Sequence, residues 1–462
     1  MFQHYTHVHF VGIGGIGMSA LAKWFLHEGV VVSGSDIHVG SITDDLETRE
    51  ATIFSGHAPT NVTQDVDLLV YSPAVADTNL ERVAARERGI PERTNFEVLG
   101  ELSKSFSTIV VSGTNGKSTT TAMLGLMLEA AGYDPTVLVG SLVPGFKDGN
   151  FRHGGGRFFV VEGCEYRANM LHLQPEMIVL TNIEEDHLDY YRDLAHIQET
   201  FQTFVDKLKG QGMVVVNADD TGSAGLSIHR PVKYGSDRTD VIYAFQERKT
   251  VMGSQKIRTN VGELELQIPG EFNVYNALAA TAAAMELGVP FETCRRVLKD
   301  FRGIWRRFER VGVWNPPSLK LRGAGGADII SDYAHHPSAI RQTIEATREF
   351  FPGRRIVLCY QPHQHDRTKK LFDEFVASLR LADLLILAEI YDVAGRNAVP
   401  AGRQEEHDVS SRDLVKAINR PNTTYASNVD EAESQLREVV RSGDVVLVMG
   451  AGDIDEVARR LA

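Results

Sequence analysis

The chain has 462 residues, which is enough for two to four domains of ordinary size. Hydrophobic residues make up 43% and charged residues 24%, as in a soluble globular protein, and the net charge of −13 argues against a nucleic-acid partner. The three cysteines form no CxxC pair, no apolar run reaches the ~20 residues of a membrane span, and the N-terminal segment lacks a signal-peptide pattern. We therefore expect a cytoplasmic protein without membrane insertion.

Strands alternate with helices along the chain, which predicts parallel sheets covered by helices. The first block has apolar strands at HVHFVG, VVVSGSD and VDLLVYSP. The pattern restarts near residue 104 with STIVVSG, RFFVVEG, EMIVLTNI and GMVVVNAD, and near residue 327 with ADIISDYA, RRIVLCYQP, ADLLILAEIY and DVVLVMGAGD. We predict an α/β protein of three domains: a Rossmann-like domain at 1–103, a central P-loop domain at 104–313 and a second Rossmann-like domain at 314–462.

A glycine-rich turn follows the first strand and precedes a helix. Gly12, Gly14 and Gly17 have GxGxxG spacing, with Gly15 between them. Such a turn brings backbone N–H groups and a helix N-terminus close to a diphosphate. Asp36 follows the second strand, where a carboxylate can bond a ribose or a base edge. The motif alone does not choose between NAD, FAD, a UDP-sugar and a turn without a ligand.

A second glycine loop, GTNGKSTT at 113–120, joins an apolar strand to a helix. Its backbone N–H groups can cradle phosphates, Lys117 can reach the outer phosphates, and Ser118 can ligate Mg²⁺. It is not a full Walker A motif, because Val111 stands where the first glycine belongs. A dehydrogenase needs no second loop, and a simple NTPase needs no first loop. Together they favour an enzyme that uses ATP to activate a nucleotide-linked substrate.

Several segments, in one order over nearly the whole chain, resemble the Mur ligases, which build the peptide stem of peptidoglycan. GTNGKSTTT is similar to the family's ATP loop, and four segments match its other motifs: VVEGCEY, TNIEEDHLDYY, GEFNVYNALAA and FRGIWRRFE. VGIGGIGMSALA, SDYAHHPSAI and YQPHQHDRT resemble the branch that joins L-alanine to UDP-N-acetylmuramate. The runner-up is the recycling branch, which attaches an intact tripeptide to the same UDP-sugar.

The resemblance implies ligation through an acyl phosphate, with ATP and Mg²⁺ (Mn²⁺ as an alternative) as cofactors. It implies catalytic roles for Lys117, Glu162, His187, Arg306, Arg307, His335 and Arg367, and metal ligation by Ser118, Glu162 and His187. The residues expected at ATP are Gly113, Thr114, Asn115, Gly116, Lys117, Ser118, Thr119, Asn273, Asn276 and Asp332. Those expected at the UDP-sugar are Gly12, Gly14, Gly15, Gly17, Asp36 and Ser72.

Some roles stay open on the sequence alone. His187 is an unusual ligand for Mg²⁺, which prefers oxygen, so a structural hydrogen-bonding role is the alternative. Asn273 and Asn276 are spaced to share a helix face, although Asn273 could instead cap the helix. One residue of the pair Arg306 and Arg307 is expected at the γ-phosphate, and one of His335 and His336 at the substrate.

The sequence also departs from the family's motifs. Asn115 replaces the usual histidine, Ser118 replaces a threonine, and EGCEY at 162–166 replaces EADES. Gln364 and His365 replace an Arg-Tyr pair. Ser118 keeps a metal-ligating hydroxyl, whereas the changes at Tyr166 and Gln364 bear on substrate selection.

Two functions from other classes compete with the ligase. An NAD-dependent oxidoreductase would use the first glycine turn and leave the second loop unexplained. A non-catalytic nucleotide-binding scaffold would have no need of the lysine, glutamate, histidine and arginine named above. The expected partners are UDP-N-acetylmuramate, L-alanine and ATP, in a monomer or homodimer whose third domain closes over ATP.

Overall fold

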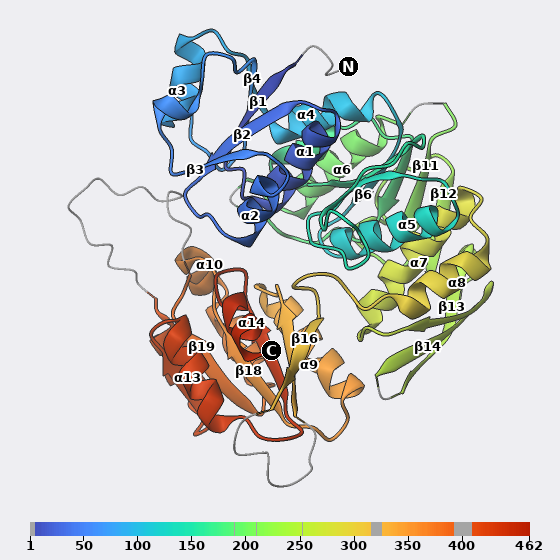
Figure 1. The fold of residues 1–462 in the computed structure, drawn as a ribbon. Helices are drawn as coiled ribbons and strands as arrows, with labels where there is room; N and C mark the ends of the chain where they lie inside the picture. The colour runs from blue at the N-terminus through green and yellow to red at the C-terminus, as the bar shows by residue number, and fades with distance from the viewer. Residues whose placement is uncertain (1–4, 189, 209, 252, 316–325, 392–408) are drawn as a thin grey trace. The chain divides into compact units, whose positions relative to one another are not determined.

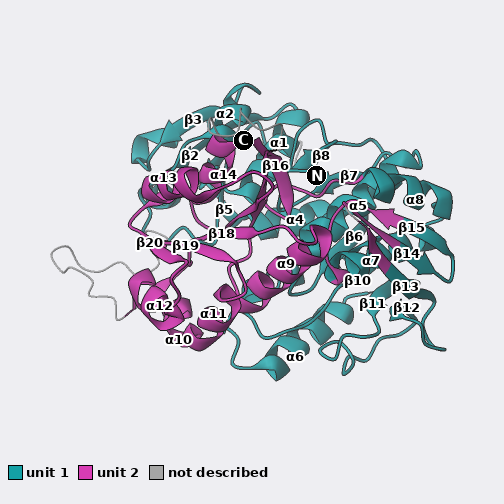
Figure 2. Cartoon of the chain, turned by 90° about the horizontal axis from the view of Figure 1, so that it is seen from below, with its two compact units in different colours: residues 1–248, 257–264, 272–300 teal, residues 249–256, 265–271, 301–462 magenta. Residues whose placement is uncertain are grey.

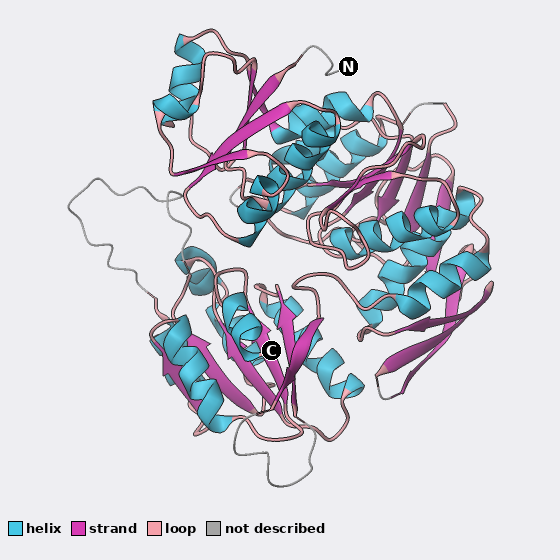
Figure 3. Cartoon of the chain, viewed as in Figure 1, coloured by secondary structure: helices cyan, strands magenta, loops and turns pink. Residues whose placement is uncertain are grey.

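A computed structural model describes residues 5–188, 190–208, 210–251, 253–315, 326–391 and 409–462. Figure 1 traces the chain, and Figure 3 shows helices alternating with strands along it. The chain forms two compact units, coloured in Figure 2. Unit 1 comprises residues 1–248, 257–264 and 272–300, and unit 2 comprises residues 249–256, 265–271 and 301–462.

Unit 1 begins with a five-stranded sheet of order β3-β2-β1-β4-β5, in which all neighbouring strands are parallel. Its strands are β1 (His7–Val11), β2 (Val31–Asp36), β3 (Thr52–Ser55), β4 (Leu68–Tyr71) and β5 (Glu92–Thr94). Its helices are α1 (Ile16–His27), α2 (Ser41–Glu47), η1 (Pro59–Asn61), α3 (Leu80–Glu87) and α4 (Asn95–Ser103). The strand order reverses at β1 and β4, so the loops after these strands flank a topological switch point, where open α/β sheets bind ligands.

The second sheet has ten strands in the order β15-β14-β13-β12-β11-β10-β6-β9-β7-β8. The strands are β6 (Ser107–Ser112), β7 (Thr136–Leu138), β8 (Phe151–Arg152), β9 (Phe158–Gly163), β10 (Met177–Leu180), β11 (Met213–Asn217), β12 (Pro231–Ser236), β13 (Tyr243–Val251), β14 (Ser254–Thr259) and β15 (Gly262–Leu266). The helices are α5 (Lys117–Ala130), η2 (Tyr166–His172), α6 (Leu194–Val205), α7 (Glu271–Glu286) and α8 (Phe291–Asp300).

The register of the three central strands gathers three loops at one edge of this sheet. Ser112, the last residue of β6, pairs with Gly163 at the end of β9 and with Leu180 at the end of β10. All three strands are parallel and almost wholly buried. The chain leaves each strand at the same edge, so the second glycine loop meets the segments that follow β9 and β10.

Unit 2 contains a six-stranded sheet of order β16-β17-β21-β18-β19-β20. The strands are β16 (Glu309–Trp314), β17 (Ala327–Asp332), β18 (Ile356–Tyr360), β19 (Leu384–Ala388), β20 (Thr423–Ala426) and β21 (Val445–Met449). The helices are α9 (Pro337–Phe350), α10 (His365–Lys370), α11 (Phe372–Leu379), α12 (Ser411–Ile418), α13 (Val429–Val439) and α14 (Asp455–Leu461). Its strands are parallel except for β16, which runs antiparallel to β17.

The α/β class and the strands expected from the apolar runs are confirmed. Two antiparallel edge strands, β8 and β16, were not predicted. β8 is short and β16 is only half-buried, so neither shows an apolar run in the sequence. The domain boundaries at 103/104 and 313/314 stay predictions, because the sheets locate domain cores and not their ends. Among the described residues, no helix is long and apolar enough to cross a membrane.

One close approach inside the first sheet gives a stability test. Gly34 lies opposite Phe10, and a Cβ there would come within 2.7 Å of the Phe10 carbonyl oxygen and 2.6 Å of Ile13 Cδ1. Gly34→Ala should therefore lower the free energy of unfolding by about 1–3 kcal/mol, measured by urea titration. Gly40→Ala is the matched control, because a Cβ at that position meets nothing within 4 Å. Equal stability of the two variants would contradict the packing described for β1 and β2.

Candidate functional site

The second glycine loop runs from the end of β6 to the first residue of α5. Gly113 and Gly116 have φ angles of +135° and +84°, a region that L side chains rarely adopt. A Cβ at Gly116 would also overlap the amide oxygen of Asn276. These two glycines therefore let the backbone turn sharply while α7 packs against it.

The segment after β10 holds this loop from the other side. The backbone N–H of Thr114 donates to the carbonyl oxygen of Asn182 at 2.9 Å, and that of Asn115 donates to the Asn182 side-chain oxygen at 2.9 Å. Thr181 Oγ1 donates to the carbonyl oxygen of Asn115 at 2.6 Å. The loop is thus fixed by side chains and backbone of the TNIEEDHLDYY segment, of which residue 189 lies outside the described residues.

Lys117 is the first residue of α5 and lies at the centre of the site. Its Nζ donates to the carbonyl oxygens of Gly113 and Thr114 at 2.6 and 3.0 Å, and it pairs with a Glu165 carboxylate oxygen at 2.9 Å. Burial by itself lowers the pKa of Lys117, but the charge of Glu165, with smaller contributions from Cys164 and Glu162, raises that pKa above its ordinary value. Lys117 therefore carries a positive charge although its side chain is only 18% exposed.

Ser118 and Glu162 form a pair beside Lys117. The hydroxyl of Ser118 donates to Glu162 Oε2 at 2.9 Å, and the backbone N–H of Gly140 donates to the other carboxylate oxygen. A hydroxyl and a carboxylate at a helix N-terminus are oxygen ligands of the kind that Mg²⁺ prefers. This pair fits the metal expected there, and Thr119 follows it in the first turn of α5.

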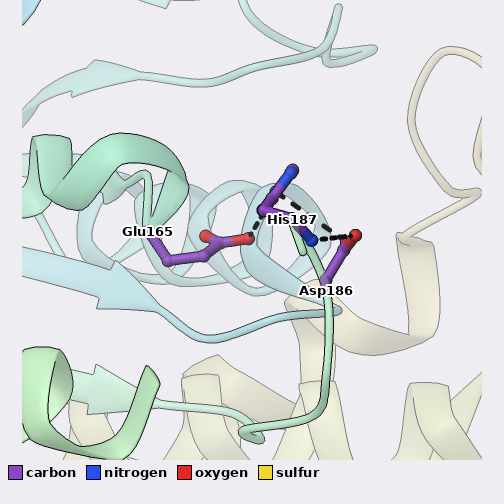
Figure 4. A group of neighbouring side chains, drawn as sticks. All are labelled: Glu165, Asp186 and His187. Atoms are coloured by element: carbon purple, nitrogen blue, oxygen red, sulfur yellow. Dashed lines mark hydrogen bonds and ion pairs between the residues drawn. The ribbon is translucent and has the colours of Figure 1, made fainter. Parts of the chain in front are cut away.

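His187 belongs to a second group of possible ligands, drawn in Figure 4. Its Nε2 lies 3.4 Å from a Glu165 oxygen and 3.8 Å from an Asp186 oxygen, and one ligand atom from each residue lies within 4.8 Å of the others. His187 has φ +54°, an uncommon conformation outside glycine that is often found at functional sites. The aromatic ring of Tyr166 packs against the His187 imidazole with 4.8 Å between ring centroids.

Glu165 and Asp186 were not named by the sequence analysis. Both lie in segments that resemble family motifs, VVEGCEY and TNIEEDHLDYY. The position of a carboxylate within a motif does not predict which one contacts Lys117. Burial tends to raise the pKa of Glu165, but Lys117 and His187 lower it, and the net shift is downward. Glu165 links Lys117 to His187, whereas Glu162 links Ser118 to Gly140.

The two asparagines expected at adenine lie on α7. Asn276 Nδ2 donates to Asn273 Oδ1 at 3.1 Å, and both side chains are buried. Asn276 Oδ1 also accepts a hydrogen bond from Thr120 of α5 at 3.4 Å. Their shared helix face is confirmed. The alternative role of Asn273 as a helix cap is wrong, because α7 begins two residues earlier, at Glu271.

The first glycine turn has a structure of its own at the switch point. The N–H of Gly12 donates to the Ser35 carbonyl oxygen at 2.8 Å, and the N–H of Gly14 donates to Asp36 Oδ2 at 2.9 Å. The backbone N–H of Ser72 donates to the Val11 carbonyl oxygen at 3.1 Å, and this bond brings the end of β4 beside the turn. Gly15 caps α1, and Gly17 lies in its first turn. The structure therefore brings together the residues expected at the UDP-sugar, with Asp36 bonded to the turn itself.

In unit 2, Arg306 and Arg307 differ sharply in their surroundings. The Arg306 guanidinium is buried and donates to the carbonyl oxygens of Gly450 and Gly452 at 2.5 and 3.0 Å. Burial lowers the pKa of Arg306, and Asp455 partly offsets this shift. Arg307 is exposed, with its guanidinium 4.9 Å from the centre of the Tyr333 ring. Arg306 thus holds a glycine turn of unit 2, and Arg307 is the solvent-facing cation.

Asp332 ends β17 and is buried. Its two carboxylate oxygens accept the backbone N–H groups of Phe308 and Ala334 at 2.7 and 2.8 Å. Burial raises its pKa, although Arg307 and the two backbone donors lower it in part. The carboxylate therefore joins the start of β16 to the turn after β17. Its expected role at ATP stays a prediction.

The two adjacent histidines also separate. His336 caps α9, where its Nδ1 lies 2.8 Å from the Ser338 hydroxyl. His335 points elsewhere: its Nδ1 lies 3.1 Å from the Tyr333 carbonyl oxygen, and its ring lies 6.1 Å from that of His363. Burial, followed by the charge of Arg367 on α10, lowers the pKa of His335 to about 3. His335 is therefore a neutral imidazole near Arg367.

Comparisons with known proteins agree over the full length. Three family models match in succession: the Mur ligase family catalytic domain at residues 7–107, the Mur ligase middle domain at 111–284 and the Mur ligase glutamate ligase domain at 306–452. A protein of Lachnospira eligens named UDP-N-acetylmuramate–L-alanine ligase is 37% identical, with 100% of this chain and 98% of that protein covered.

Solved structures give the same picture. The UDP-N-acetylmuramate-alanine ligase of Thermotoga maritima has a TM-score of 0.82 at 29% identity, with 98% of each chain covered. The murein peptide ligase of Psychrobacter arcticus shares the fold, with a TM-score of 0.71 at 23% identity over 99% of this chain and 98% of that one.

The pair of half-buried Lys117 and buried Glu165 predicts a pH-dependent effect on stability. Glu165→Gln leaves the lysine without its counter-charge, so it should lower the free energy of unfolding by about 3 kcal/mol at pH 7. Because the folded-state pKa of Glu165 lies below its ordinary value of 4.5, its stabilisation is complete above pH 4.5 and is lost as pH falls through the folded value. The difference between wild type and variant should therefore shrink below pH 4.5, as measured by chemical denaturation.

The matched control for this test is Glu101→Gln, which breaks the exposed pair of Glu101 with Lys104. An exposed pair is worth at most about 1 kcal/mol, so little change is expected. A Glu165→Gln effect as small as that of the control, or one independent of pH from 7 to 3, would show that the pair does not form in solution.

Proposed function

The chain belongs to the Mur ligase family, and from that premise we propose that it joins L-alanine to the carboxylate of UDP-N-acetylmuramate with cleavage of ATP to ADP and phosphate. The observation that carries this proposal is the arrangement at the start of α5. There, the half-buried cation Lys117 lies beside two groups of possible metal ligands, Ser118 with Glu162 and Glu165 with His187. The name of the Lachnospira eligens relative supports L-alanine as the amine donor.

The reaction has two steps. An oxygen of the sugar-acid carboxylate attacks the γ-phosphorus of ATP, the bond to the bridging oxygen breaks, and ADP leaves. The amine of L-alanine, after losing a proton, then attacks the acyl carbon, and inorganic phosphate leaves as the amide forms. A carboxylate and a γ-phosphate are both anions, so cations must hold them together and neutralise the charge that develops.

We assign these tasks to residues of unit 1. Lys117, held by two loop carbonyls, is placed to bind the outer phosphates, and the N–H groups of the loop and of the first turn of α5 cradle them. Mg²⁺, held by Ser118 and Glu162, would shield the phosphate charge. His187, with Glu165 beside it, would hold a second Mg²⁺. Asn273 and Asn276 are assigned to the adenine side.

Unit 2 supplies the residues for the amino acid. Arg307 is proposed as the cation that reaches the γ-phosphate, because Arg306 is committed to the Gly450 and Gly452 carbonyls. Arg367 suits a bidentate grip on the alanine carboxylate. His335, being neutral, can orient the incoming amine through a hydrogen bond without adding charge.

We further propose that the protein works in the cytoplasm, where its UDP-linked substrate would be made, as a monomer or a homodimer.

The ligase function uses both glycine loops, whereas an NAD-dependent oxidoreductase would use only the first. The tripeptide-adding branch of the family uses the same UDP-sugar and differs only in the amine donor. A direct comparison of amines therefore separates the two ligase functions.

The first test is product analysis by mass spectrometry. The protein is incubated with ATP, Mg²⁺ and UDP-N-acetylmuramate, and L-alanine, L-serine, glycine and the muropeptide tripeptide are offered in parallel. We expect an L-alanine adduct with release of one phosphate per product. A tripeptide adduct alone would assign the protein to the recycling branch, and the absence of any adduct would contradict ligase activity.

Substitutions in the ATP loop test the roles assigned there. Lys117→Ala should lower kcat/KM by about 10²–10³ or more, because the variant loses a charge that acts on the phosphates in the transition state. Ser118→Ala should raise the Mg²⁺ concentration needed for half-maximal rate, whereas Ser118→Thr keeps the hydroxyl and should remain close to wild type. Equal Mg²⁺ requirements for the alanine and threonine variants would show that this hydroxyl does not ligate the metal.

A further inference from the structure

A buried polar network joins the first sheet of unit 1 to the second. Its centre is Lys23 on α1, whose side chain is only 3% exposed. The ammonium group donates to the Asp148 carbonyl oxygen at 2.7 Å and to Asn150 Oδ1 at 2.9 Å, and it pairs with Asp45 Oδ2 on α2 at 2.7 Å. These three partners match the three donors of an ammonium group.

Asn150 completes the connection to the glycine turn. It is fully buried, and its Nδ2 donates to the carbonyl oxygen of Ile16 at 2.6 Å and to the hydroxyl of Ser19 at 2.9 Å. Ile16 is the first residue of α1, directly after the turn, and the cap residue Gly15 contributes no side-chain hydrogen bond. A side chain from the segment before β8 therefore fixes the helix start that presents the first glycine turn.

Three outer contacts surround this centre. The carboxylate of Asp148 accepts a hydrogen bond from Arg49 and lies 3.1 Å from His27 Nε2, while Arg49 also pairs with Asp45 at 3.1 Å. Lys23, Asp148 and Asn150 at the centre of the network are buried. Removing one of them leaves uncompensated polar groups, so the network strongly favours one alignment of α1 with the chain that precedes β8.

The same chain segment touches the ATP side at its other end. Residues 139–150 connect β7 to β8, and the N–H of Gly140 donates to Glu162 Oε1. Glu162 in turn accepts from Ser118 at the start of α5. One short segment therefore contacts the proposed metal carboxylate through Gly140 and the start of α1 through Asn150.

We propose that residues 139–150 are a brace that couples the UDP-sugar turn to the ATP loop, with Asn150 and Lys23 as its positioning residues. The identity of the two ligands rests on the proposed function. When a metal and a nucleotide bind at Glu162, they fix the Gly140 end of the brace. The Asn150 end then holds α1 in the alignment that binds the diphosphate. ATP and the UDP-sugar should therefore favour each other's binding.

Asn150→Asp is the sharpest variant. It keeps the size of the side chain and the acceptor for Lys23, but it loses both N–H donors to α1. Asn260→Asp is the matched control, because Asn260 is exposed and makes similar hydrogen bonds, to Ile242 and Ala244, in unit 1 away from the brace. Lys23→Met, which removes the central charge, should act in the same direction as Asn150→Asp.

The measurements are steady-state kinetics and the Kd of UDP-N-acetylmuramate with and without Mg²⁺ and a non-hydrolysable ATP analogue. In Asn150→Asp we expect the KM for the UDP-sugar to rise about tenfold, as the loss of two buried hydrogen bonds suggests. The KM for ATP should stay within about twofold when it is measured at a low UDP-sugar concentration, where the coupling contributes little. The analogue should tighten UDP-sugar binding in wild type and in Asn260→Asp but not in Asn150→Asp. If the substitution only lowered the amount of folded protein, the apparent kcat would fall, but the KM for the UDP-sugar would not rise relative to the KM for ATP.

Two results would overturn the brace: wild-type KM and Kd values in Asn150→Asp, or a wild-type Kd that the analogue does not change. If wild type ligates no UDP-sugar, the proposed function fails separately. The brace is then judged by amide hydrogen exchange over residues 14–27. Faster exchange there in Asn150→Asp than in Asn260→Asp supports it, and equal exchange overturns it.

Discussion

The contact between the ammonium group of Lys117 and the carboxylate of Glu165 is the interaction on which the ATP side of this protein depends. A half-buried lysine at the first residue of a helix is placed against the helix dipole, whose N-terminus also carries positive charge. Burial would drive this lysine towards its neutral form, and the neighbouring carboxylate prevents that. Under the proposed function, this charge meets the triphosphate oxygens. It is held in place before any nucleotide arrives, so the reaction would require little reorganisation.

The surroundings of this pair are built from backbone that is uncommon outside glycine. His187 has φ +54°, and Arg167 and Ala168, which follow Glu165 closely, have φ +50° and +57°. Each such residue costs of order 1–3 kcal/mol, which the neighbouring structure must offset. These residues follow β9 and β10, and the buried side chains of these strands fix where the loops begin. Rigid parallel strands therefore support strained turns that carry the chemical groups.

Unit 2 separates adjacent residues of the same type in a similar way. Arg306, also at positive φ, is drawn inward by the Gly450 and Gly452 carbonyls, and Arg307 is left in solvent over Tyr333. His336 caps a helix, while His335 lies near Arg367 and has a lowered pKa. In both pairs, one member maintains the structure, and the other is the one to which the proposed function assigns a ligand.

The sequence by itself determined the α/β class, both glycine loops and the family, because these depend on local patterns: apolar runs of strand length, glycines at fixed spacing and motifs in a fixed order. It also placed Asn273 and Asn276 on one helix face, since that follows from helical periodicity. It did not predict the antiparallel edge strands β8 and β16, which are too short or too exposed to show an apolar run.

Only the tertiary structure decided which charged groups meet. Glu165 rather than Glu162 faces Lys117, Asp186 joins His187, and Asn150 reaches α1 from 134 residues away along the chain. Motif spacing cannot reveal such pairings, because strand register and the packing of one sheet against another set them. The physical reason is that burial makes a charge depend on its spatial neighbours, and those neighbours come from segments far apart in the sequence.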